Sequence, residues 1–171
     1  MTALAALAAV YGAGLLYEAD FAPAGCCGLS LPNPDPMQAE RLLAQSDPKG
    51  TSVNAQRKAA LALLAARPGD VGGWLRLAYA DRLEHGRLTE AGVHDLEMSY
   101  LVDPFAYRQS PWRLAFALDN WGGLSPEARK DALKEIELVK RSPEIQDDAR
   151  QAVRAIHNPS GRMTAALMGL S

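Results

Sequence analysis

The chain has 171 residues and a formal net charge of −2, and its 30 alanines and 24 leucines far outnumber its 14 valines, isoleucines and threonines. Alanine and leucine favour helices, and the β-branched and aromatic residues that build strands are scarce, so an all-β fold is excluded. The 18 basic residues are interleaved with 20 acidic ones instead of gathering on one face, which argues against a nucleic-acid-binding protein.

Residues 1–20 form an apolar N-terminal segment. Residues 3–17 carry no charge, and four acidic residues precede the first basic one, Arg41. The run is shorter than the roughly 20 residues of a membrane span, and Ala22-Pro23-Ala24 resembles a signal-peptide cleavage site, although a basic start is missing. Three interpretations stay open: an uncleaved membrane anchor, a cleaved signal peptide, or a helix packed in the core.

Residues 21–35 are rich in proline and glycine, which favours a linker without regular helix. The linker holds both cysteines of the chain, Cys26 and Cys27. Adjacent cysteines with no nearby histidine lack the spacing of a zinc site and are poorly placed to bridge each other. Their role stays open.

Residues 36–171 form the predicted domain, in which helix-capping residues recur every 15 to 21 residues. Capping residues, several with proline just inside the helix, predict where each helix starts. The predicted starts are Asp35-Pro36, Ser52, Asp70, Thr89, Ser110-Pro111, Ser125-Pro126 and Ser142-Pro143. Apolar residues spaced three or four apart, such as Ile145, Ala149 and Val153, give each segment one narrow apolar stripe. We therefore predict an all-α fold of antiparallel helix pairs stacked as a short α-solenoid.

One stretch reads Trp74-x-x-Leu77-Ala78, then Gly86-Arg87-Leu88-Thr89-Glu90-Ala91, then Pro104. This stretch resembles the tetratricopeptide repeat. It departs from the family pattern because the turn arrives one residue late, the proline two late, and Asp81 occupies a position that is usually apolar. The resemblance implies a binding protein, with Trp74 and Trp112 as packing residues.

If the pairs stack as in that family, the first helix of each pair lines a concave face that binds the partner. The residues expected to face inward are found by counting along the helices from Trp74 and Trp112. Aromatic and arginine side chains at such positions are the usual anchors of recognition. The candidate partner-binding residues are Leu75, Tyr79, Arg82, Arg113, Asn120 and Trp121, with Leu83 and Ala117 also facing inward.

No motif indicates an enzyme or a cofactor. The glycine pairs lack the context of phosphate-binding loops, and His85, His94 and His157 lack metal-ligand spacing. The prediction is a non-catalytic adaptor without metal or cofactor that binds a protein or peptide.

Chains with an apolar N-terminus and tetratricopeptide-like pairs resemble envelope-assembly proteins of Gram-negative bacteria. This implies the bacterial inner membrane facing the periplasm, or the periplasm, with a polysaccharide or secretion complex as partner and membrane contact through residues 3–17. A cytoplasmic protein is the alternative location. The alternative functions are a structural accessory subunit of a membrane complex and a small-ligand-binding protein.

Overall fold

The computed structural model describes residues 52–170. The predicted apolar segment 1–20, the linker 21–35 and the first part of the domain 36–171 lie outside the described residues, as do Cys26 and Cys27. Within 52–170 the chain forms seven α-helices, one short 3-10 helix and no strand, so the predicted all-α class is confirmed there. The helices are α3 (Val53–Ala66), α4 (Val71–His85), α5 (Glu90–Val102), α6 (Ser110–Asp119), η1 (Trp121–Gly123), α7 (Pro126–Lys140), α8 (Pro143–Arg154) and α9 (Pro159–Leu167).

Most of these helices start where the sequence predicts, and side-chain capping bonds form at three of those starts. The side chains of Ser52, Asp70 and Ser125 accept hydrogen bonds from the first free backbone amides of α3, α4 and α7. Thr89 and Ser142 precede α5 and α8 without a side-chain capping bond. Ser110 is the first residue inside α6, and its hydroxyl donates to a carboxylate elsewhere. At the other end of α4, Gly86 takes the left-handed conformation that terminates helices.

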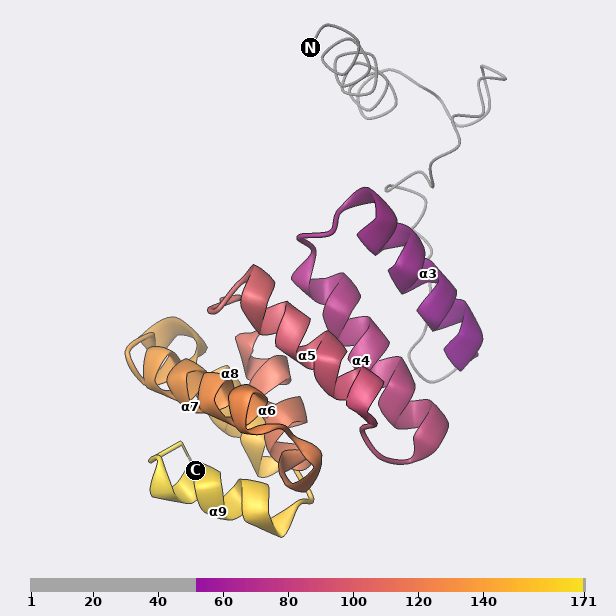
Figure 1. Cartoon of the computed structure of the whole chain (residues 1–171). Helices are drawn as coiled ribbons and strands as arrows, with labels where there is room; N and C mark the ends of the chain where they lie inside the picture. The colour runs from indigo at the N-terminus through magenta and orange to yellow at the C-terminus, as the bar shows by residue number, and fades with distance from the viewer. Residues whose placement is uncertain (1–51, 171) are drawn as a thin grey trace, which may run out of the picture.

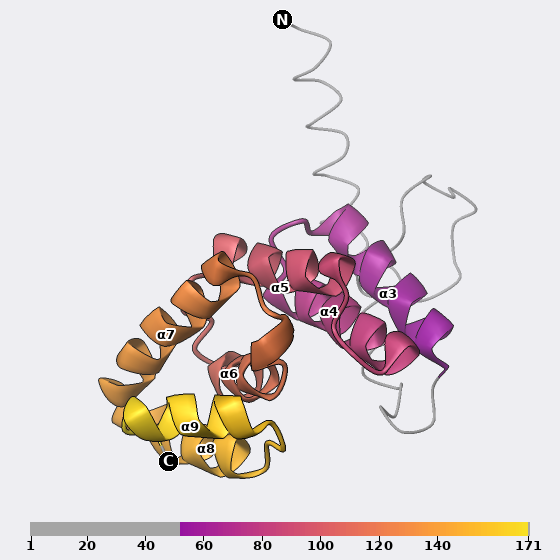
Figure 2. The same cartoon turned by 60° about the horizontal axis from the view of Figure 1, so that its bottom comes forward.

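The helices form two groups that lie side by side (Figures 1 and 2). In the first group α4 packs between α3 and α5, and in the second α6 contacts α7, α8 and α9. Contacts between α5 and α7 join the groups. One apolar core runs through both, with Leu96, Leu114 and Ile136 fully buried. Alanines with no exposed surface, such as Ala117 and Ala132, allow the helices to approach closely.

Asp81 is buried although the family pattern expects an apolar residue there. Its carboxylate accepts hydrogen bonds from the Thr89 backbone N–H at 2.8 Å and from the Thr89 hydroxyl at 2.7 Å. The Thr89 side chain makes no capping bond to the free amides at the start of α5. Asp81 on α4 bonds to Thr89 instead and so fixes this end of α5. A Cβ on Gly92 would lie 2.3 Å from the Asp81 carboxylate, so this approach requires glycine.

The carboxyl of Asp95 on α5 is half-buried, and this burial raises its pKa from 3.8 to about 6. The charge of Asp81 adds to this rise, and those of His94 and Arg57 oppose it. The Asp95 carboxyl ionises less readily in the folded chain than in the unfolded one. Its ionisation therefore lowers the free energy of unfolding progressively as the pH rises from 3.8 to about 6, and the full loss is reached above about pH 6.

Asp95→Asn is therefore expected to raise the Tm at about pH 7.5 and to leave it almost unchanged at about pH 3, where the native carboxyl is protonated. Thermal melts at both pH values test this difference. NMR titration of the Asp95 carboxyl should give a midpoint near pH 6. A midpoint at the ordinary value of 3.8 would contradict the burial.

Between residues 52 and 170 the structure has no helix of the length and apolar character that crossing a membrane requires.

Candidate binding groove between α4 and α6

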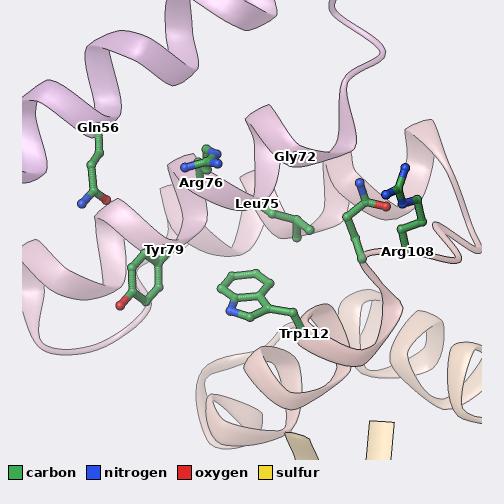
Figure 3. Close-up of a pocket in the computed structure, with 8 residues that line it drawn as sticks. Gln56, Gly72, Leu75, Arg76, Tyr79, Arg108 and Trp112 are labelled. Carbon is green, nitrogen blue, oxygen red and sulfur yellow. The ribbon is translucent and has the colours of Figure 1, made fainter. Parts of the chain in front are cut away.

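A groove of about 370 Å3 opens between α4 and the start of α6 (Figure 3). Three parts of the chain line it: the first turn of α3, one face of α4, and α6 with the turn before it. The lining residues are Gln56, Gly72, Leu75, Arg76, Tyr79, Arg108, Gln109 and Trp112. None of them is acidic, so the groove combines apolar surface with positive charge. We call it the α4–α6 groove.

Aromatic side chains form one wall of the α4–α6 groove. Trp112 stacks on Phe116 with ring centroids 4.9 Å apart and an interplanar angle of 11°, and Tyr79 meets Trp112 edge-on at 5.9 Å. Trp112 is nevertheless 42% exposed, whereas the sequence predicts a packing residue. The difference arises because Phe116 covers one side of the indole and the groove leaves the rest open. Figure 3 shows the indole ring close to Leu75 and Tyr79.

Two arginines supply the positive charge. Arg76 and Arg108 are exposed, and neither guanidinium has an ion-pair or hydrogen-bond partner among residues 52–170. Some other arginines of this part of the chain are paired, for example Arg57 with Glu84 and Arg150 with Asp147, whereas Arg87 and Arg154 have no side-chain partner there either. Unpaired guanidinium groups beside exposed aromatic rings can recognise a carboxylate that lies next to an apolar side chain.

The structure brings only some of the sequence-predicted site residues to this groove. Leu75 and Tyr79 line it. Arg82 and Asn120 lie further along the same two helices, where the Arg82 Nε donates to the Asn120 amide oxygen at 3.0 Å. Trp121 lies apart from them, in a shallower groove, with the Arg129 guanidinium 5.8 Å from the centre of its ring. The six predicted residues therefore do not form one surface.

Arg113 is predicted to face a partner, but its side chain has no exposed surface. The reason is Glu135 on α7, which is equally buried and forms an ion pair with Arg113. Arg113 also donates to the backbone oxygens of Ser99 and Asp103, both at 2.9 Å. These bonds satisfy a charge that burial alone would make very costly, so Arg113 is held in the core and offers no partner-binding surface.

Glu135 is the centre of the buried network. It accepts hydrogen bonds from the Arg113 guanidinium, from the Ser110 hydroxyl, and from the Tyr100 hydroxyl at 2.9 Å. Burial raises the pKa of Glu135, and its bonds to these donors only partly oppose the rise. Because the donors belong to α5 and the first turns of α6, the network fixes the start of α6 against α5 and α7. It thereby positions Trp112 at the groove.

Arg76, Arg108 and Gln109 also line the groove but are not among the site residues predicted from the sequence. Arg108 and Gln109 directly precede the predicted helix start Ser110-Pro111. Polar residues just before a helix whose first turn carries an aromatic side chain were the available sequence signal for a binding site there. Arg76 lies between Leu75 and Leu77 and carries no signal of its own. Among residues 52–170 no group of histidine, cysteine, aspartate and glutamate side chains is arranged to hold a metal ion.

Comparison of the chain with family models, with curated proteins and with solved structures finds no match.

Proposed function

We propose that the protein is a non-catalytic adaptor of the cell envelope whose α4–α6 groove holds a segment of a partner protein. The observation that carries this proposal is the combination in one groove of Trp112, which is 42% exposed, with two arginines that have no partner within residues 52–170. Exposed tryptophan, tyrosine and arginine are the residue types that contribute most to binding energy at protein interfaces.

The chemistry of the groove indicates the partner's chemistry. Arg76 and Arg108 favour a segment that carries aspartate or glutamate, and the surface formed by Leu75, Tyr79 and Trp112 favours an aromatic or branched apolar side chain beside it. Burying one such side chain against the indole would give affinity, and the carboxylates would give specificity.

A tetratricopeptide-like arrangement of the helix pairs is part of the proposal. Its support is the pair α4 and α5, which carries the motif residues and turns at Gly86. Trp74 packs against the cluster of Ala60, Leu64 and Leu77, as a packing residue of that motif would. In this arrangement α4 and α6 are first helices of successive pairs, and the groove lies on the face where such pairs bind partners.

The envelope location rests on residues 3–17, which lie outside the described residues. The mass of the native chain in membrane and soluble fractions tests it. A full-length chain in the membrane fraction would support an anchored adaptor or a structural accessory subunit of a membrane complex. A soluble chain shortened by about two dozen residues would support an exported domain. A full-length soluble chain in the cytoplasm would contradict both.

Selection of random peptides against the intact chain tests the groove. The recovered peptides are expected to carry aspartate or glutamate close to phenylalanine, tryptophan or leucine. Their Kd should rise about tenfold or more in Trp112→Ala and in Arg76→Glu. Arg162→Glu, which changes an exposed arginine on α9 outside the groove, is the matched control and should leave the Kd unchanged. Peptides that bind equally well to the groove variants would refute the proposal.

A small-ligand-binding protein is the second candidate, because about 370 Å3 lies within the usual range of small-molecule pockets. A thermal screen with aromatic carboxylates tests it. A rise of several degrees in the Tm that Trp112→Ala abolishes would favour this candidate over the peptide adaptor.

A further inference from the structure

A second groove, of about 530 Å3, lies between α5 and α7 and shares no residue with the α4–α6 groove. On α5 it is lined by the buried Tyr100 and by His94, Glu97, Met98 and Leu101. The last four follow the spacing i, i+3, i+4 and i+7, which places them on one face of the helix. We call this second site the α5–α7 groove.

On α7 the opposite wall is formed by Glu127, Asp131, Lys134 and Leu138. Their spacing of four, three and four residues again marks one face of a helix. Two neighbouring helices that present one stripe each offer ridges against which a third helix can pack. The shape of the α5–α7 groove therefore favours a helical occupant.

Hydrogen bonds between α5 and α7 hold the two walls together. The Ser125 hydroxyl donates to Glu97, and the Tyr100 hydroxyl donates to the buried Glu135 at 2.9 Å. The α5–α7 groove is therefore formed before an occupant arrives, which lowers the entropic cost of binding.

The two ends of the α5–α7 groove differ in chemistry. Glu127 lies in the first turn of α7 and has no ion-pair or hydrogen-bond partner among residues 52–170, and Glu97 of α5 lines the same groove. Lys134 is the one lysine of the lining, and its ammonium group lies 2.7 Å from the Asp131 carboxylate. The charge of this groove is thus net negative, opposite to that of the α4–α6 groove.

Apolar side chains form the other end. Leu101 is 74% exposed, and Met98 and Leu138 beside it are half-buried. Covering an exposed leucine with an apolar side chain removes area from water, and methionine adapts its shape to an incoming group.

We propose that the α5–α7 groove binds a helical segment of a second partner protein, with lysine or arginine at one end and a large apolar anchor at the other. The basic end would face Glu97 and Glu127, and the anchor would cover Leu101. With two grooves of opposite charge that share no residue, the protein would bridge an acidic partner segment and a basic one.

The test uses a fluorescein-labelled helical peptide of about 14 residues, roughly 21 Å long, with lysines in its first turns and leucines in its last turns on one face. We expect saturable binding to the intact chain that weakens with salt. Amide chemical shifts should change in α5 and α7. Leu101→Ser and Glu127→Lys should each raise the Kd about tenfold.

Matched variants separate this site from general attraction between opposite charges. Leu61→Ser changes another exposed leucine, on α3, and Glu144→Lys changes another first-turn glutamate, on α8. Both should leave the Kd unchanged, and melting curves should show that Leu101→Ser is folded. Three results would each overturn the proposal. They are a Kd that does not change in Leu101→Ser, equal binding of a peptide with glutamine in place of leucine, and chemical-shift changes confined to the α4–α6 groove.

Discussion

Replacing Glu135 with alanine is expected to lower the free energy of unfolding by about 3–5 kcal/mol, because Arg113 would keep a buried charge without its partner. Neither side chain has exposed surface, and the carboxylate accepts bonds from Arg113, Ser110 and Tyr100. Urea denaturation followed by circular dichroism measures the loss.

Lys134→Ala is the control for this prediction. Lys134 is the preceding residue, and its ion pair with Asp131 has the same charges but lies in solvent. Exposed pairs contribute about 1 kcal/mol or less, so this loss should be small. The double variant Arg113→Met with Glu135→Leu removes both charges and should lose less than Glu135→Ala alone. A loss below about 1 kcal/mol for Glu135→Ala would mean that the charges are not buried together.

Gly161→Ala is expected to destabilise the protein by about 2–3 kcal/mol, although alanine is normally the better helix former by about 1 kcal/mol. The reason is the contact between α9 and α6. A Cβ on Gly161 would lie 1.9 Å from the Leu118 carbonyl oxygen, and a backbone atom cannot move aside as a flexible side chain can. Thermal or urea unfolding gives the sign directly.

Gly122→Ala serves as the control, because nothing lies within 4 Å of the Cβ that it would add. Its effect should stay within about 0.5 kcal/mol. If Gly161→Ala instead stabilises the chain, as helix propensity alone predicts, then α9 does not pack against α6 at this distance.

The helix starts could be predicted because capping is a local interaction. Ser52, Asp70 and Ser125 bond to amides three residues further along the same segment, so the sequence contains both partners within a few positions. Thr89 and Ser142 make no such side-chain bond, and neither does Ser110. Its hydroxyl bonds to Glu135, which is 25 residues away in sequence, and no local pattern indicates that pairing.

The candidate site could be predicted only in part for the same reason. Leu75 and Tyr79 follow from helical spacing along α4, and both line the α4–α6 groove. Spacing along α6 puts Arg113 on the same face, but the carboxylate of Glu135 on α7 draws its guanidinium into the core. Trp112 and Arg108 reach the groove because the turn before α6 brings them opposite α4.

The sequence by itself determined the helical class of the described chain, the starts of most helices and the apolar stripe that each one buries. These properties depend on residues within one or two turns of each other, so propensity, capping and periodicity suffice. Only the tertiary structure decided which charges are buried and which are free. That outcome depends on the partner that packing supplies: Arg113 meets Glu135 and is neutralised in the core, whereas Arg76 and Arg108 meet no carboxylate within residues 52–170 and stay available at the groove.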